Sequence, residues 1–468
     1  MLHGHLGTGK TIIFEEARYL SAARGTKTYQ FEKSISLDQL RYAIDTLPAY
    51  SRVFYEGDIF NVKDIAQQIR KKNIAFCATC RTTTFRVAGG GLFHEAKPYL
   101  KVFNANNLSK KEIIEYSKLI DEMGFWPADL AKIDPARREN ILIKDYDSSL
   151  SAILVKIFEN EKITDLVKAD WDKIKPRLEK IKDHFIVNSY FRCIDVEVPS
   201  YIINQFQNMD YGAIDKFSSD IVRNHLDGTI SFNNAIIGEF VFKNYIPEIE
   251  VSGAIVRFSN FINEHPSQRS LQWTVRRLLR YTNLARILNS AKKPLDVFDK
   301  ASFVSSVSSD PLFWVQYSIA QLANDNWPAA ERHVNKAYDV AKGRKKKFDT
   351  YQVDTHAARL KIQHVITFGA KEGDSANIRE AVRLLNSVID RRPDDSYHVS
   401  SVLVTMLRSD IHWHHVLRAD DHKMVTSFFR EIYSKLSLNT PTETSFASEQ
   451  EATERLKKYL EFVSASRF

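Results

Sequence analysis

The residues best suited to chemistry in this sequence lie within its first eleven positions. They follow the spacing G-x-x-x-x-G-K-[S/T], the pattern of a phosphate-binding loop. The residues that make up or fill this pattern are Gly4, Gly7, Thr8, Gly9, Lys10 and Thr11. Glycines let the backbone wrap closely, so that its N–H groups can point at phosphate oxygens. We therefore predict an ATP or ADP site in which Lys10 reaches the β- and γ-phosphates and Thr11 holds Mg²⁺.

The residues after this loop have the pattern of a helix. Apolar side chains recur from Ile12 to Ala23, and Gly25 is a suitable residue to end the helix. A helix that begins at the loop directs its positive end at the phosphates, which is the context that the motif needs. A glycine-rich turn that matches by chance is the alternative.

Two further charged positions follow predicted strands. The strand Arg52–Glu56 ends in an acid, and Glu56 is suited to hold Mg²⁺ and to position the attacking water. Asp58 lies two residues further on, so either acid could take the metal role. Arg81 follows the predicted strand Asn73–Thr79, where a cation can sense the γ-phosphate. A solvated strand end and an exposed surface arginine are the alternative interpretations.

The spacing Cys77-x-x-Cys80 also occurs in metal and redox sites. In a strand, residues three apart point to opposite faces of the sheet. No second cysteine pair lies nearby, so we expect no metal site here.

Only Met1–His3 precede Gly4, whereas a strand usually needs about five residues. We therefore expect the strand before the phosphate-binding loop to be missing. This predicts that the chain is an N-terminal truncation, or a miscalled start, of a longer protein.

The composition limits the class of protein. A chain of 468 residues can hold about three domains. No apolar run approaches the roughly 20 residues of a membrane span, and no signal peptide opens the chain. We therefore expect no membrane partner. Three cysteines do not make a disulfide framework, so we expect a cytoplasmic protein.

The net charge of +8 is unevenly distributed. Residues 1–108 carry +6, 109–183 carry −1, 184–250 carry −5 and 251–468 carry +8. Because nucleic-acid binding needs clustered Lys and Arg, the acidic third segment argues against a nucleic-acid partner.

These segments also differ in pattern. Residues 1–108 alternate strand and helix signals, which favours a mainly parallel sheet. Residues 109–183 are helical and begin with a capping box at Ser109, typical of a small helical lid. Residues 184–250 combine short helices with a turn at Gly228, as in a winged helix.

Residues 251–468 are almost entirely helical, and two sets of residues match tetratricopeptide (TPR) spacing. The first set is Trp314, Ala330 and Ala337, and the second is Gly369, Ala381 and Pro393. Stacked helical hairpins leave a groove for partners, so we expect this segment to bind a protein trigger. The polar residues 439–453 are expected to be a linker before a last helix.

The order of these parts resembles the STAND class of P-loop ATPases, the signalling NTPases of innate immunity and prokaryotic antiviral defence. The resemblance is carried by Gly4–Thr11, the strand ending at Glu56, Thr79-Cys80-Arg81 and the lid start at Leu108–Glu112. The repeat-like segments 310–317 and 348–360 also resemble those of bacterial defence STAND proteins. Gly124–Pro127 is a loose match to the adenine-side motif of the family, and His225 is the candidate for its diphosphate-contacting histidine.

The resemblance implies a multidomain architecture: an α/β P-loop NTPase with an incomplete sheet, a helical lid, a winged helix and TPR-like repeats. It implies a slow ATPase that acts as a signalling switch and forms a homo-oligomer when ATP is bound. Some members carry an N-terminal sirtuin-like or nuclease effector, and here such a domain would lie upstream of Met1. Two other functions remain open: a DNA-handling AAA-type ATPase, and a repeat scaffold with a decayed nucleotide site.

Overall fold

The computed structural model describes most of the chain. The described residues are 2–4, 10–31, 35–56, 59–81, 101–146, 148–194, 196, 198–206, 219–225, 228–265, 272–288, 293–344, 347–368, 375–392, 397–408, 417–438 and 447–465. The chain divides into two compact units. The first holds residues 1–258 and 286–288, and the second holds 259–285 and 289–468.

A five-stranded sheet forms the start of the first unit. Its strands are β1 (Leu2–Gly4), β2 (Thr28–Phe31), β3 (Arg52–Tyr55), β4 (Ala75–Arg81) and β5 (Phe103–Asn104). All neighbouring strands are parallel, in the order β2-β3-β4-β1-β5. This confirms the prediction of a parallel α/β sheet.

The position expected to lack a strand holds a short one. Leu2 and His3 pair with Thr79 and Cys80 of β4, and on the other side with Phe103 and Asn104 of β5. Because β1 is hydrogen-bonded on both sides, three residues are enough to hold it in place. The expectation of a missing first strand is therefore corrected.

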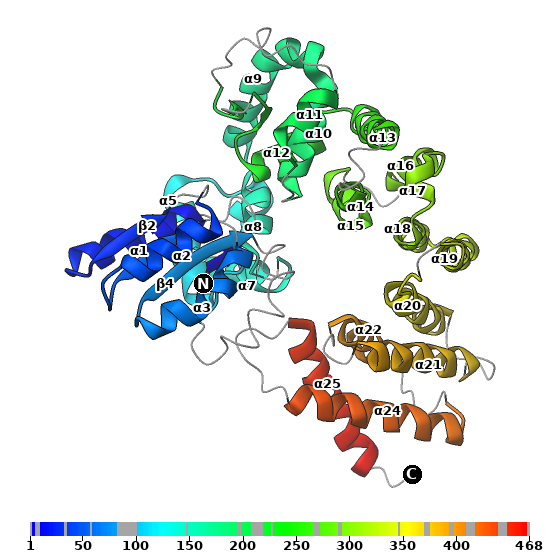
Figure 1. Ribbon diagram of the computed structural model, residues 1–468. Coiled ribbons are helices and arrows are strands. Elements are labelled where there is room, and N and C mark those ends of the chain that lie inside the picture. Colours follow the sequence, from blue (N-terminus) through cyan, green and yellow to red (C-terminus); the bar gives the residue numbers. More distant parts are fainter. Residues whose placement is uncertain are drawn as a thin grey trace. The chain divides into compact units, whose positions relative to one another are not determined.

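Helices cover both faces of the sheet (Figure 1). They are α1 (Lys10–Ala23), α2 (Leu37–Thr46) and α3 (Ile59–Lys71). Alternation along β3 assigns the faces: Phe54 contacts Phe14 of α1, whereas Val53 and Tyr55 pack with residues of α2 and α3.

The next part of the first unit is helical, as predicted for residues 109–183. Its elements are α5 (Lys110–Met123), α6 (Ala128–Ala131), α7 (Pro135–Lys144), α8 (Leu150–Ile157), α9 (Glu161–Leu178) and the 3₁₀ turn η2 (Glu179–Ile181). Ser109 and Glu112 form the predicted capping box, and Gly124 ends α5 with a positive φ of 66°. The first four of these helices share an apolar core that includes Ile113, Trp126 and Ile153.

The remainder of the first unit places a hairpin between helices. Its elements are α10 (Lys182–Cys193), α11 (Ser200–Phe206), β6 (Val222–Asn224), β7 (Ile230–Phe232), α12 (Ala235–Asn244) and the start of α13 (Glu248–Glu264). The strands β6 and β7 are antiparallel, and Gly228 between them has a φ of 78°. This confirms the predicted turn. Helices α10 and α13 run across the boundaries expected near residues 183 and 250.

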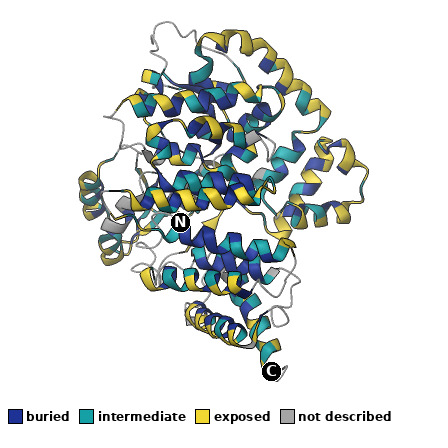
Figure 2. Cartoon of the chain, turned by 90° about the vertical axis from the view of Figure 1, so that its right-hand side faces the viewer, coloured by how far each residue is buried: buried dark blue, intermediate teal, exposed yellow. Residues whose placement is uncertain are grey.

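The second unit is built from helices. After the end of α13 they are α14 (Gln272–Leu278), α15 (Tyr281–Ile287, which the division of the chain splits), α16 (Lys293–Ala301), α17 (Ser305–Ser308), α18 (Pro311–Leu322), α19 (Trp327–Lys342), α20 (Tyr351–Phe368), α21 (Ser375–Arg391), α22 (Tyr397–Arg408), α24 (Ala419–Leu438) and α25 (Ala447–Ala465). Figure 2 shows helices with one dark-blue buried side and one yellow exposed side, as stacked hairpins require.

The first predicted repeat agrees with the hairpin of α18 and α19. Ala330 and Ala337 of α19 are fully buried, and Trp314 of α18 packs against the same core. In the second, Ala381 is buried on α21, but α20 ends at Phe368. Gly369 and Pro393 lie outside the described residues.

The predicted linker 439–453 is corrected at its end. Helix α25 begins at Ala447, and Ala452 within it is fully buried. Burial of this small side chain against the helix stack outweighs the polar composition of the segment. Among the residues that the structure describes, no helix combines the length and apolar character that a membrane crossing needs.

Candidate nucleotide site

The strand order of the sheet changes direction at β1, and we call the space beyond the carboxyl end of this strand the crevice. From β1 the chain crosses to β2 at one edge, returns through β3 and β4 to the side of β1, and then places β5 on its other side. In open α/β sheets, ligands bind outside the carboxyl ends of the strands at such a change of direction. The strand β1 ends at Gly4, the first residue of the predicted phosphate-binding loop.

The predicted loop leads from this crevice into a long helix. Lys10 is the first residue of the 14-residue helix α1, and Thr11 is the second. The first turn of α1 holds no acidic residue, so no side chain of the helix competes with an anion at its positive end. Gly7, Thr8 and Gly9 lie outside the described residues.

Packing and capping fix the position of α1. Phe14 is buried and meets Phe54 of β3 edge-on, with ring centroids 5.0 Å apart. At the other end, the N–H of Thr26 donates to Ser21 O, and Gly25 adopts a φ of 76°, as in a Schellman cap. Helix α1 is therefore packed on the face of the sheet that holds Phe54, whereas Ile12 and Ile13 in its apolar pattern are exposed.

Glu56, the acid predicted to hold Mg²⁺ and position the attacking water, follows β3, the strand next to β4. Glu56 comes directly after Tyr55, which pairs with Ala78 of β4. Since β4 separates β3 from β1, Glu56 lies two strand spacings, about 10 Å, from the β1 strand. Because β4 fills the space between the two strands, a metal ion held by Glu56 would lie beyond the carboxyl ends of the strands. Asp58 lies outside the described residues.

Arg81 lies nearer to the loop than the sequence indicated. The strand β4 continues past Thr79 and ends at Arg81, whose backbone pairs with Gly4. The expectation that Arg81 follows the strand is therefore corrected. The extra two residues are held by pairing with β1, and they bring Arg81 to the crevice.

The two cysteines of β4 do not converge. Cys80 packs in the core beneath α2 and α3, whereas Cys77 pairs in register with Phe54, which faces α1. Burial raises the pKa of the Cys77 thiol, which disfavours the thiolate that metals need. Among the described residues, no cluster of His, Cys, Asp or Glu could hold a metal ion.

Residues after β5, which the sequence did not single out, join the crevice to the helical region. The N–H of Ala105 donates to His3 O at 2.7 Å, and Leu150 of α8 donates to Asn106 O at 2.8 Å. Asn106 is buried, and it belongs to no sequence motif. Only its hydrogen bond in the folded chain identifies it. The helices 109–183 thus begin beside the carboxyl end of β1.

His225 lies on the β6–β7 hairpin. Its ring Nε2 is 2.8 Å from Ser231 Oγ and 3.4 Å from Arg192 Nη1. The backbone N–H of His225 donates to Thr229 O. These contacts hold the ring between its own hairpin and α10. A diphosphate contact for His225 stays a prediction.

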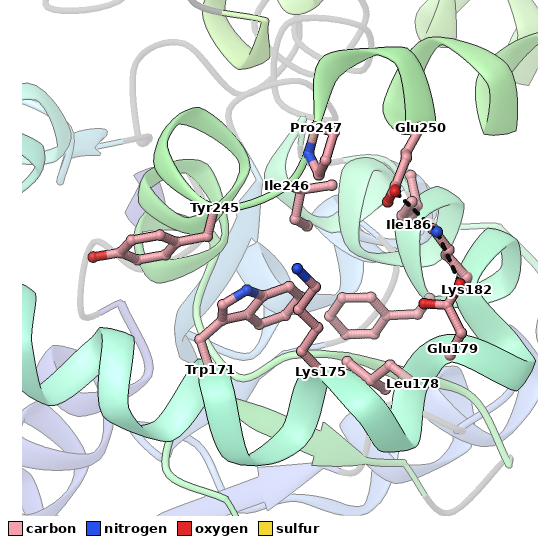
Figure 3. A pocket seen from close by; sticks show the side chains of 11 residues that line it. Trp171, Lys175, Leu178, Glu179, Lys182, Ile186, Tyr245, Ile246, Pro247 and Glu250 are labelled. Atoms are coloured by element: carbon pink, nitrogen blue, oxygen red, sulfur yellow. Dashed lines mark hydrogen bonds and ion pairs between the residues drawn. The ribbon is translucent and has the colours of Figure 1, made fainter.

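A small cavity lies between α9, α10 and the start of α13 (Figure 3). Trp171, Leu178 and Ile246 line it, and the Lys182 ammonium bridges Glu179 and Glu250 at its edge. Its volume is about 30 Å³, room for a water molecule but not for a nucleotide.

No protein-family model matches the sequence, and no curated protein matches it. One solved structure is similar at low level: a signal transduction ATPase with numerous domains (STAND) and a tetratricopeptide repeat sensor, from Pyrococcus horikoshii. The match has 12% identity, covers 99% of this chain and 78% of that chain, and has a TM-score of 0.28. At that TM-score the likeness says nothing about the fold or activity of this chain.

Proposed function

We propose that this protein is an ATP-dependent signalling switch, a slow P-loop ATPase of the STAND kind. One observation carries the proposal: the phosphate-binding motif begins where β1 ends, between β4 and β5, and leads into α1. A chance glycine-rich turn has no reason to occur at a strand where the order of the described sheet reverses.

In this proposal, different residues of the crevice bind the nucleotide and support its hydrolysis. The backbone of Gly4–Gly9 would surround the phosphates, and Lys10 would neutralise the β- and γ-phosphates. Mg²⁺ fits oxygen ligands, which Thr11 and either Glu56 or Asp58 can supply. These acids would also orient the attacking water, and Arg81 would sense the γ-phosphate.

The rest of the first unit would close the site. Its helical part starts beside β1 through the contacts of Ala105 and Asn106, which supports the role of residues 109–183 as a lid. The β6–β7 hairpin and its flanking helices are compatible with a winged helix that contacts the nucleotide from the other side. In this proposal ADP holds the lid and the winged helix closed over the crevice.

The helical second unit would be the sensor. A protein trigger bound to residues 251–468 would favour an open state, in which ATP replaces ADP and protomers assemble into a homo-oligomer. Moving the population from 1:99 to 99:1 takes about 5.5 kcal/mol of differential binding energy. The resemblance of the repeat segments to bacterial defence proteins supports a role in antiviral defence, in the cytoplasm.

Mass photometry of the full chain tests the proposal. We expect a monomer with ADP and a larger species with Mg²⁺ and a non-hydrolysable ATP analogue plus any trigger that binds. Lys10→Ala should remain monomeric in every condition. The same mass in all conditions would exclude nucleotide-gated assembly.

A further inference from the structure

A groove in the second unit is lined by one face each of three helices. From α19 the lining residues include Glu331, Val334 and Tyr338, which follow helical spacing. From α20 they include Asp354, Ala357 and Lys361, and from α21 Glu380, Leu384 and Arg391. The groove has a volume of about 820 Å³, within the range of ligand-binding clefts.

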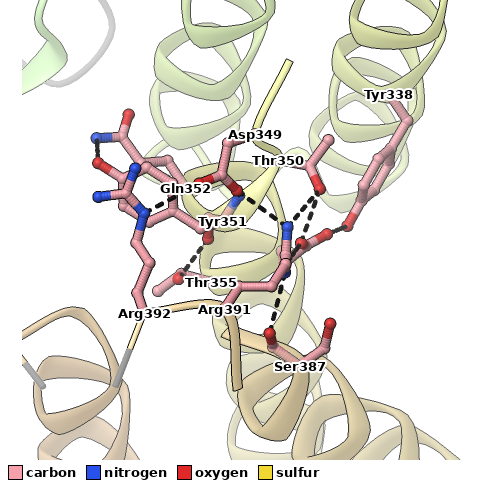
Figure 4. A network of polar contacts seen from close by, with 10 residues as sticks. Tyr338, Asp349, Thr350, Tyr351, Gln352, Thr355, Ser387, Arg391 and Arg392 are labelled. Atoms are coloured by element: carbon pink, nitrogen blue, oxygen red, sulfur yellow. Dashed lines mark hydrogen bonds and ion pairs between the residues drawn. The ribbon is translucent and has the colours of Figure 1, made fainter. Parts of the chain in front are cut away.

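The inner end of the groove is held rigid by one carboxylate. Asp354 of α20 accepts hydrogen bonds from Tyr338 Oη of α19 at 2.7 Å and Thr350 Oγ1 at 2.9 Å, and it forms an ion pair with Arg391 of α21. Figure 4 shows Tyr338, Thr350 and Arg391 converging on this point. One buried side chain therefore joins all three helices, and the groove is formed before any ligand binds.

Arg391 is saturated by its neighbours and serves as part of the wall. Its Nε donates to Ser387 O at 3.0 Å, and its Nη1 donates to Asp349 Oδ1 at 3.0 Å. A ligand in the groove must therefore be recognised by other groups, namely the floor and the outer end.

The floor is apolar and the outer end carries both signs of charge. Val334, Ala357 and Leu360 are at most 6% exposed and form the floor. The outer charges are Glu331, Lys361 and the ion pair of Arg383 with Glu380. Counting all charged lining residues, three acids face three bases, so the groove is neutral.

This neutrality selects the class of ligand. A polyanion such as nucleic acid needs an excess of Lys and Arg, which the groove lacks. A membrane surface would meet a concave groove rather than a projecting apolar face. An apolar side chain flanked by one acidic and one basic residue fits the floor and the outer charges together.

The length of the groove is that of a short peptide. The lining positions of α21 run from Glu380 to Arg391, about 16 Å at 1.5 Å per residue. An extended chain covers this length with about five residues. We propose that the groove between α19, α20 and α21 binds an extended protein segment of about five residues, with an apolar centre flanked by opposite charges. This inference rests on the proposed sensor role of the second unit.

The test begins with a displayed library of random seven-residue peptides, selected on the full chain. Enriched peptides are then synthesised, and their affinities are measured by fluorescence polarisation on the wild type and on Lys361→Glu. The control is Lys336→Glu, which reverses an exposed charge of α19 outside the groove lining. Each measurement is repeated in the Lys10→Ala background. Peptide binding is thereby measured independently of nucleotide binding, and the two proposals can fail separately.

We expect enriched peptides to share an apolar residue between an acid and a base. Lys361→Glu should weaken their binding at least tenfold, Lys336→Glu should change it less than twofold, and a peptide with its acid replaced by lysine should restore binding to Lys361→Glu. The rescue shows that the variant is folded. The proposal is overturned if no peptide is enriched, if Lys361→Glu binds as the wild type does, if the swapped peptide fails to restore binding, or if a single-stranded oligonucleotide displaces the peptide from the groove.

Discussion

Gly4 and Arg81 are backbone partners at the carboxyl ends of the parallel strands β1 and β4. One is the first residue of the phosphate-binding motif, and the other is the last residue of its neighbouring strand. This register places the backbone of Arg81 beside the start of the loop, although 76 residues of chain separate the two positions. Arg81 is therefore the side chain that we expect to distinguish ATP from ADP.

Replacing Arg81 by alanine should weaken ATP more than ADP. A hydrogen bond to a charged group contributes about 1.5–3 kcal/mol, so the preference for ATP should fall about tenfold or more. Titration with fluorescent ATP and ADP analogues measures the ratio. Arg24→Ala, at the exposed far end of α1, is the matched control and should leave the ratio unchanged. An unchanged ratio in Arg81→Ala would remove the sensor role.

The substitution Glu56→Gln should spare nucleotide binding and slow hydrolysis. The amide keeps the shape of the side chain after β3 but loses the charge that holds the metal and orients water. Phosphate release at saturating ATP should fall at least tenfold, while ATP affinity stays within about threefold. Glu16→Gln on the exposed side of α1 is the control. Unchanged hydrolysis would point to Asp58 as the acid instead.

Much of the fold could be predicted because its signals are local. The capping box of Ser109 and Glu112 and the positive φ of Gly124 and Gly228 depend on residues within one turn. The strands β2 and β3 likewise occur where short apolar runs meet turn residues. These elements form largely as their own sequence directs.

The features that could not be predicted depend on distant partners. The strand β1 has only three residues and is held by β4 and β5, and Arg81 joins β4 because β1 lies beside it. In the groove, Tyr338, Asp354 and Arg391 come from three helices, and no local pattern relates them. Their meeting follows from how the helices stack.

His356 should make the stability of the second unit depend on pH. Burial, with a smaller contribution from Arg359, lowers its pKa to about 3 from the ordinary value of 6.5. Its Nε2 lies 2.9 Å from Ser318 Oγ, and its Nδ1 is buried without a partner among the described residues. Between pH 6.5 and 3 the unfolded chain binds a proton that the folded chain does not, so stability is complete above pH 6.5 and falls as pH decreases.

The expected loss from His356 between pH 7 and pH 5 is about 2 kcal/mol, since each pH unit below 6.5 costs about 1.4 kcal/mol. Urea unfolding at both pH values measures it. His356→Gln should lose less stability than the wild type over this range. Equal pH dependence in the two proteins would show that His356 titrates normally in the fold.

The Asp354 carboxylate should stabilise the junction of three helices. Asp354→Asn removes the charge opposite Arg391 in a buried position, and we expect a loss of about 2 kcal/mol because Asp349 still pairs with Arg391. Glu431→Gln is the control, since its pair with Lys435 is exposed and should contribute about 0.5 kcal/mol or less. Urea unfolding midpoints compare the two variants. Similar losses in both would mean that the Asp354 network adds no more than a surface ion pair.

Nucleotide binding by the full chain tests the central claim most directly. Isothermal titration of the wild type and of Lys10→Ala with ATP and Mg²⁺ compares proteins that differ by one charge at the start of α1. We predict saturable binding with a stoichiometry of one by the wild type, and an affinity at least tenfold weaker in Lys10→Ala. Equal affinity in the two proteins, or no binding by a folded wild type, would contradict the assignment of the crevice at β1 as a nucleotide site.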